Sequence, residues 1–332
     1  MNELPDAVLI CKSPKAGSGR FVELVPSLIE ALRNRGVEVH ATADVEQLRC
    51  LATSLQNQGR LKAVVAAGGD GTLSLVIANC PKGTAVMPLP LGTENLMARY
   101  LGHRPSVQDT MNTIMLQRTV QLDAATANDR LFLIMCSCGF DAEVVRRLHT
   151  TRRGHIWKLS YAAPILRSVF DYRFPRIRLI DRDNEIQSEP SCWAFVFNVP
   201  RYAAGLRIGA WADATDGWLD AITLDKGSVL HSFQYLIHIL RNTHRDLKGT
   251  VVSRGQRYRI ESADGQTDVP FQLDGDFAGF LPVDIEILPA RVTLLLPQHC
   301  PVPLDDLKPR SGSVSERSLE TAPSPVRSSL AR

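Results

Sequence analysis

The feature that most constrains the fold is an apolar run, Leu61–Val65, that leads through two alanines into Gly68-Gly69-Asp70-Gly71-Thr72. A β-branched run that ends in glycines predicts a strand, a tight loop and then a helix. Three glycines in four positions let the backbone approach a ligand closely and adopt positive φ angles. Thr72 can cap or enter a helix whose first amides face an anion. The motif predicts a phosphate loop holding a carboxylate, although a strand–turn–helix corner needing glycine only for geometry would leave the same pattern.

The motif differs from both common phosphate loops, because it lacks the Lys-Ser/Thr of G-x-x-x-x-G-K-[ST] and the spacing of G-x-G-x-x-G. Around it, strand and helix patterns alternate over the first 120 residues. Such alternation predicts a parallel sheet with helices on both faces. Ligands of such sheets gather beyond the carboxyl ends of the strands. We therefore expect one crevice to be lined by the loops that follow four strands: Ser13–Gly19, Thr42, Gly68–Thr72 and Leu91–Asn95.

The pattern changes near residue 120 to short strands separated by turns, which predicts a mainly antiparallel second domain. Helical insertions are expected near 157–171 and 228–247. We place a nucleotide-binding α/β domain at 1–121 and a β-rich domain at 122–297; 298–332, rich in Pro, Ser, Arg and Glu, is expected to be a disordered or regulatory tail. The strands expected in the second domain are Val120–Ala124, Leu131–Met135, Arg176–Ile180, Cys192–Val199, Leu219–Leu224, Gln256–Ile260, Phe271–Leu273, Val283–Leu288 and Val292–Leu296.

Charge and cysteine content limit the class of protein. A net charge of +3 over 332 residues gives no electrostatic reason to expect nucleic acid as a partner. The seven cysteines are odd in number and include no C-x-x-C, which indicates a reducing, cytoplasmic compartment with free thiols. No apolar run approaches the 18 residues of a membrane span, so only surface attachment is left open. The arginines before Trp157 could face an anionic bilayer or form a solvated helix face.

Two further glycine-bearing loops are candidates for binding phosphate. Lys12–Gly19 follows the first strand, and Lys15 is its expected charged contact. In Pro90–Asn95, Thr93 can donate to a phosphate or cap a helix, and Asn95 can orient a neighbouring group. Each loop could also be an ordinary turn.

Two acidic motifs lie in the second domain. Asp274-Gly275-Asp276 can accept a proton or hold a divalent metal, but Asp-Gly is also typical of a type I′ hairpin turn. The segment Asp213–Leu219 suits either a hard cation or a tight turn.

Together these motifs, in this order over residues 7 to 297, resemble the diacylglycerol kinase catalytic-domain family, which includes bacterial lipid kinases and sphingosine kinases. The motifs that carry the resemblance are Ser13–Gly19, Gly68–Thr72, Pro90–Asn95, Phe140–Ala142, Asn198 with Tyr202–Gly205, Asp216–Asp220 and Asp274–Asp276. The resemblance implies a nucleotide-binding α/β domain, a β-sandwich-like domain, and ATP-dependent phosphorylation of a lipid hydroxyl between them.

The resemblance also implies roles for individual residues. Asp276 would accept the proton with Asp274 assisting, and Asp70 with Asp123 would organise Mg²⁺. A structural Mg²⁺ would bind Asp216 and the backbone near Asp213 and Trp218. The implied ATP-binding residues are Ser13, Pro14, Lys15, Ala16, Gly17, Thr42, Gly68, Gly69, Asp70, Gly71, Thr72, Leu73, Ser74, Leu75 and Thr93.

Three features depart from the family pattern. Ser74-Leu75 replaces Asn-Glu, and Leu96 replaces an acidic residue. Asp276 replaces a glutamate, which withdraws the carboxylate by roughly 1.5 Å, where a 1 Å misplacement can cost about 100-fold in rate.

We predict a peripheral membrane lipid kinase with a lipid alcohol as substrate, and a homodimer is left open. The alternatives are an NAD kinase-like enzyme, which shares the Gly-Gly-Asp-Gly-Thr motif, and a non-catalytic nucleotide- or lipid-binding sensor.

Overall fold

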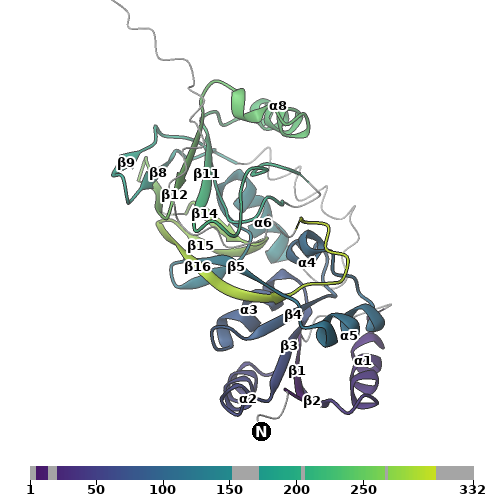
Figure 1. Cartoon of the computed structure of the whole chain (residues 1–332). Coiled ribbons are helices and arrows are strands. Elements are labelled where there is room, and N and C mark those ends of the chain that lie inside the picture. The colour runs from purple at the N-terminus through teal and green to yellow at the C-terminus, as the bar shows by residue number, and fades with distance from the viewer. Residues whose placement is uncertain (1–4, 14–20, 152–171, 203–205, 266–267, 304–332) are drawn as a thin grey trace, which may run out of the picture.

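The structure is a computed structural model, and it describes residues 5–13, 21–151, 172–202, 206–265 and 268–303. Its first half is the expected parallel α/β unit, with strand order β2-β1-β3-β4 (Figure 1). The elements of this half are β1 (Ala7–Lys12), α1 (Leu24–Arg33), β2 (Glu38–Thr42), α2 (Val45–Asn57), β3 (Leu61–Gly68), α3 (Asp70–Asn79), β4 (Ala85–Pro90), α4 (Leu96–Leu101) and α5 (Val107–Leu116).

Alternation along the buried strands explains the helices on both faces. In β1, Val8 and Ile10 belong to the core beneath α1 and α5, whereas Leu9 and Cys11 belong to the core beneath α2 and α3. Successive side chains of a strand point to opposite faces, so a strand covered on both sides is apolar throughout. The α/β expectation is confirmed.

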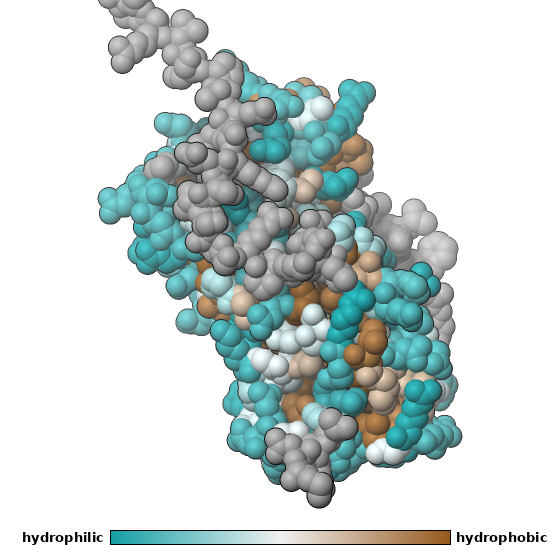
Figure 2. All heavy atoms as spheres, in the orientation of Figure 1, coloured by the Kyte–Doolittle hydropathy of each residue, from teal (hydrophilic) through white to brown (hydrophobic). Residues whose placement is uncertain are grey.

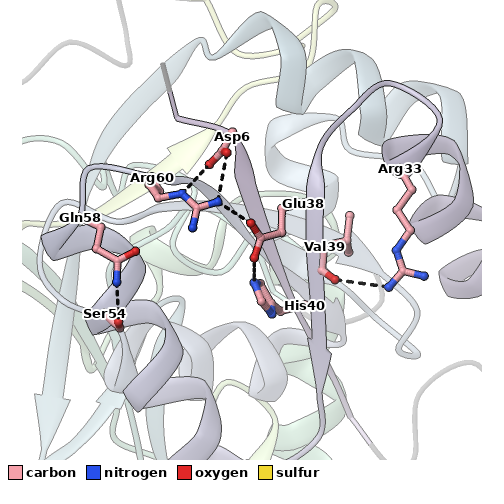
Figure 3. A network of polar contacts seen from close by, with 8 residues as sticks. All are labelled: Asp6, Arg33, Glu38, Val39, His40, Ser54, Gln58 and Arg60. Atoms are coloured by element: carbon pink, nitrogen blue, oxygen red, sulfur yellow. Dashed lines mark hydrogen bonds and ion pairs between the residues drawn. The ribbon is translucent and has the colours of Figure 1, made fainter. Parts of the chain in front are cut away.

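Arg60 ties together the amino ends of three strands (Figure 3). Its guanidinium donates two hydrogen bonds to the Asp6 carboxylate, both at 3.1 Å, and also pairs with Glu38. Arg60 lowers the pKa of both carboxyl groups. This exposed cluster lies at the edge of the sheet opposite the carboxyl ends where the site was predicted.

The second half is the expected antiparallel β-rich unit. A six-stranded sheet, β12-β11-β10-β7-β14-β15, packs on a ten-stranded sheet that continues from the parallel strands. The elements are β5 (Thr119–Ala127), β6 (Arg130–Phe132), β7 (Met135–Gly139), α6 (Phe140–Thr151), β8 (Ile177–Asp181), β9 (Ile186–Gln187), β10 (Trp193–Phe197), β11 (Leu219–Leu224), α8 (Val229–Leu240), the 3₁₀ helix η4 (His244–Asp246), β12 (Thr250–Gly255), β13 (Arg257–Ser262), β14 (Pro270–Leu273), β15 (Asp276–Phe280) and β16 (Val283–Leu295).

We expected two strands of the second domain, Val283–Leu288 and Val292–Leu296, but the structure has one, β16. The expectation was also wrong about the sheet partner, because the end of β16 joins the parallel sheet. β16 pairs antiparallel with β13 and β5, and its last residues pair parallel with β4. A bulge between Leu288 and Val292, with Ala290 at φ +47°, allows this change of partner. The sequence pattern shows the interruption but not the distant partner beyond it. The proposed boundary at 121/122 lies inside β5.

The expected strand Leu131–Met135 is also interrupted, because β6 ends at Phe132 and β7 starts at Met135. Helix α8 confirms the second helical insertion; the first, at 157–171, lies outside the described residues, as does 304–332 of the expected tail. Cys300 of that tail packs partly buried against the larger core. No helix in the described segments is long and apolar enough to span a membrane.

Asp123, in β5, anchors the bulge of β16. Its two carboxylate oxygens accept hydrogen bonds from Ala290 N and Gly217 N, each at 2.7 Å. Burial raises the pKa of Asp123, against the opposing effect of these two amides. The carboxylate thereby holds two loops that are distant in sequence.

We predict that Asp123→Asn destabilises the protein by about 1–3 kcal/mol, because the new NH₂ group faces a backbone donor and leaves it unsatisfied. Urea unfolding in EDTA measures the change. Asp129→Asn, at an exposed turn residue with φ +66°, is the matched control. Equal stability of the two variants would contradict the anchoring role.

Candidate active site

The glycine loop connects β3 to α3, and Asp70 is the first residue of the helix. The Asp70 carboxylate is buried and accepts hydrogen bonds from Leu96 N at 2.8 Å and Met97 N at 3.0 Å. These amides begin α4, so Asp70 caps that helix and joins two loops. Burial raises the pKa of Asp70, and the two amides act in the opposite direction.

The glycines allow close packing. A Cβ added to Gly92 would lie 2.6 Å from Gly69 Cα, and one added to Gly68 would overlap the Thr72 side chain. None of Gly68, Gly69 and Gly71 has a positive φ angle, so the expectation that these glycines would adopt positive φ angles was wrong. The Gly68–Thr72 segment and the Gly92 turn approach each other backbone to backbone, which requires the absence of side chains rather than an unusual φ.

Asn95 fixes the second loop. Its side chain accepts from Gly92 N and donates to Gly92 O, both at 2.9 Å, while its own φ is +50°. This confirms that Asn95 orients a neighbouring group. Thr93 is exposed on the same loop.

Asp274 and Gly275 form the turn of the β14–β15 hairpin. Their φ angles are +51° and +89°, and Leu273 pairs with Asp276 across the turn, as in a two-residue type I′ hairpin. Gln272 Oε1 accepts a hydrogen bond from Gly275 N at 2.7 Å and so fixes the turn. The hairpin interpretation of Asp-Gly is therefore right for the backbone.

The Asp274 side chain binds two segments outside the hairpin. Its buried carboxylate accepts from Leu133 N, Ile134 N and Met135 N at 2.8, 2.9 and 3.0 Å. Ser74 Oγ, in α3, donates to the same carboxylate at 3.3 Å. Burial raises the pKa of Asp274 to about 6, against the lowering effect of the three amides. Asp274 thus interrupts the expected Leu131–Met135 strand and joins the hairpin to α3.

Asp276 begins β15 and is half-buried. A Cβ added to Gly71 would lie 2.9 Å from Asp276 Oδ2, so this carboxylate lies directly against the glycine loop. Asp70 also helps to raise the pKa of Asp274. The structure therefore brings Asp70, Asp274 and Asp276 together at the start of α3, from the two halves of the chain.

The other predicted nucleotide residues lie at the same sheet edge or outside the description. Ser13 N donates to Ala67 O at 3.2 Å, at the end of β1. The Thr42 hydroxyl donates to Gln47 Oε1 at 2.5 Å within the start of α2. Leu73 is buried and Leu75 is partly exposed on α3. Pro14, Lys15, Ala16 and Gly17 lie outside the described residues.

The predicted metal residues form a separate group. Asp123 contacts Gly217, and Asp213 helps to raise the pKa of both Asp123 and Asp216. Asp216 pairs with Arg254 and accepts from Trp218 N at 3.0 Å. Within the described part of the chain, no three His, Cys, Asp or Glu side chains come together as metal ligands. A metal role for these residues stays a prediction.

Sequence reasoning missed Gln272 and Ser137, which support the hairpin, and it named Asp141 and Tyr202 only as motif positions. Gln272 Nε2 donates to Ser137 Oγ at 2.8 Å and to Asp141 Oδ2 at 3.3 Å, and Tyr202 also donates to Asp141. Burial raises the pKa of Asp141. The available signal was a polar glutamine between the apolar Phe271 and Leu273, two positions before Asp274.

Comparisons with known proteins find similar proteins for both halves of the chain. The model for the diacylglycerol kinase catalytic domain matches residues 7–127, and that for the YegS C-terminal NAD kinase beta sandwich-like domain matches 135–296. A protein of Mycobacterium tuberculosis named diacylglycerol kinase is 27% identical over 301 residues, covering 86% of this chain and 94% of its own. One from Staphylococcus epidermidis is 23% identical, covering 87% and 92%.

The fold is similar to the crystal structure of a diacylglycerol kinase from Bacillus anthracis str. Sterne, with a TM-score of 0.65. The match has 17% sequence identity and covers 88% of this chain and 98% of the other. At this identity the likeness concerns the fold alone.

We predict that Asp274→Asn lowers the free energy of unfolding by about 1–3 kcal/mol, because the new NH₂ group would face backbone N–H donors and leave them unsatisfied. The raised pKa of Asp274 makes its contribution largest below pH 4 and removes it as the pH rises through about 6. The stability gap between wild type and variant should therefore be wider at pH 4.5 than at pH 7.5. Asp276→Asn is the control, and a gap independent of pH would contradict the assignment.

Proposed function

The chain belongs to the diacylglycerol kinase catalytic-domain family, and on that premise we propose that it transfers the γ-phosphoryl group of ATP to a lipid hydroxyl. One observation carries the proposal: the Asp276 carboxylate of the β-rich half lies against Gly71 of the glycine loop. A proton acceptor and a phosphate loop are therefore neighbours. This is the arrangement that phosphoryl transfer to an alcohol requires.

The nucleotide side of the proposal rests on backbone geometry. The start of α3, with Gly69 as its N-cap, presents amides and the positive end of the helix dipole to an anion. The closely packed Gly69 and Gly92 allow a phosphate to approach two loops at once. Asp70 fixes their relative position through the α4 amides.

The acceptor side of the proposal rests on Asp276. The lipid hydroxyl oxygen attacks the γ-phosphorus, the bond to the ADP oxygen breaks, and the hydroxyl proton passes to the Asp276 carboxylate. Gln272 and Asp274 hold the turn that presents this carboxylate. We assign both to positioning, because their polar atoms already bind protein groups.

Mg²⁺ bound with ATP would offset the charge of the phosphates. The Asp70 oxygens already accept α4 amides, and the described residues gather no three side-chain ligands. We therefore expect the phosphates and water to supply most of the ligands, with Asp70 and Asp276 contributing charge nearby.

A structural cation at the second acidic group is a separate part of the proposal. Asp213 lies within electrostatic range of Asp123, Asp216 and Asp220, and Arg254 is a counter-charge for Asp216 and Asp220. Burial raises the pKa of Asp220 to about 7, and repulsion from Asp216 and Asp213 adds to it. A cation near Asp213 and the Trp218 backbone would relieve this repulsion.

We predict that replacing MgCl₂ with EDTA at equal ionic strength lowers Tm, by about 2–4 °C for each kcal/mol of binding lost. In Asp213→Asn the shift should shrink, since the variant keeps the oxygen that accepts from Thr215 but loses the charge. Differential scanning calorimetry without nucleotide measures both. A wild-type Tm that is the same with MgCl₂ and with EDTA would exclude the structural site.

A second candidate function is nucleotide binding without transfer. The apolar Leu75 and Leu96 stand where the resemblance implies acidic residues, which favours a binding protein. Such a protein would bind ATP but release no labelled product. The assay below separates the two functions.

We predict that purified protein with γ-labelled ATP and a lipid extract yields a labelled product in the organic phase. Asp276→Asn should lower the rate by at least about 100-fold, the usual contribution of a positioned base. Its thermal stability should match wild type, because Asp276 is half-buried at a strand start.

Asp129→Asn serves as the control for this assay and should keep full activity. Label that moves to NAD in the aqueous phase would favour the nucleotide kinase instead. Wild-type turnover by Asp276→Asn would overturn the assignment of the base.

A further inference from the structure

Helix α8 (Val229–Leu240) projects from the end of the molecule farthest from α1 and α2 (Figure 1). It contains no Asp, Glu, Lys or Arg. Five large apolar side chains of the helix are exposed: Leu230 at 76%, Phe233 at 54%, Leu236 at 41%, Ile237 at 48% and Leu240 at 67%. Figure 2 shows hydrophobic side chains at the surface of this end of the molecule, among hydrophilic ones.

The exposed side chains form one face. At 100° per residue, these five positions fall within an arc of about 120°. Tyr235 and Ile239 lie on the opposite face and are buried. The helix is therefore apolar on its outer face as well as on its inner face.

The inner face holds the helix firmly. Ser228 caps it by accepting from His231 N at 3.2 Å. The Tyr235 hydroxyl accepts from Lys226 N at 3.0 Å and donates to Asp225 at 3.3 Å, and its ring packs edge-on against Trp193. The apolar outer face is thus presented by a docked element.

Charge identifies the partner. From Lys226 to Lys248 the chain carries four basic residues and one acidic residue, Asp246. Lys226 precedes the helix, and Arg241, Arg245 and Lys248 follow it. An apolar stripe with basic residues at its ends matches an anionic bilayer, in which side chains enter the acyl boundary and cations meet headgroups. Two copies packed through this face would bring like charges together.

We propose that the outer face of α8 docks the protein on an anionic lipid bilayer; this face, defined by Leu230, Phe233, Leu236, Ile237 and Leu240, is called the α8 patch. The proposal extends the proposed function, since a lipid alcohol resides in such a bilayer. Each basic residue at an anionic surface adds about fivefold to the partition coefficient. Binding should therefore fall steeply with salt.

The test is sedimentation of the full chain with lipid vesicles in the absence of ATP. One set of vesicles is pure phosphatidylcholine, and the other contains about 30% phosphatidylglycerol. Wild type should bind the anionic vesicles and be released by high salt. Phe233→Gln with Ile237→Gln should weaken binding by at least about tenfold, because both apolar side chains are lost. Arg241→Gln with Lys248→Gln should weaken it on anionic vesicles only.

The control replaces two exposed apolar residues of the first half, Val22→Gln with Leu116→Gln, which are 48% and 51% exposed. This variant should bind like wild type. The proposal is overturned if the variant Phe233→Gln with Ile237→Gln also binds the vesicles like wild type. It is also overturned if wild type is a dimer that only this variant dissociates. Since the assay needs no ATP, its failure is distinct from a failure of kinase activity.

Discussion

The pairing of β16 with β13, β5 and β4 is the interaction on which the rest of the structure depends. Beyond its bulge the strand leaves the β-rich half and completes the edge of the parallel sheet. Asp123 holds this bulge by accepting from Ala290 N. The ten-stranded sheet is therefore continuous across both halves, and the six-stranded sheet that carries the hairpin of Asp276 packs on it through a shared apolar core. Without it, the two halves would be joined only by connecting segments and side-chain contacts.

Buried carboxylates perform much of this positioning. Asp70, Asp123 and Asp274 each accept backbone hydrogen bonds from segments distant in sequence. A charged acceptor makes stronger hydrogen bonds than a neutral one, and these bonds offset part of the cost of burial, which still raises the pKa of all three carboxyl groups. Asp276 lies half-buried beside Gly71, where the proposed function makes it the proton acceptor. Ser74, which departs from the family pattern, donates to Asp274 and so adds to the support of the hairpin.

Much of the local structure could be predicted from the sequence. Alternating strands and helices predicted the parallel sheet, and Asp274-Gly275 predicted a type I′ turn, because period and turn chemistry are local properties. The single strand β16 and the break at Leu133–Ile134 could not be predicted. Both depend on partners far along the chain, β4 and Asp274. The role of Gly92 was hidden for the same reason, since its neighbour is Gly69.

The sequence by itself determined the element types, the glycine loops and the family to which the chain belongs, since these depend on residue order and spacing. Only the tertiary structure decided which carboxylates hold the fold and which lies beside the loop. It also decided that Tyr235 is buried while Phe233 is exposed, although both lie on one apolar helix. The physical reason is that burial and hydrogen-bond partners arise from packing between distant segments, which no local pattern records.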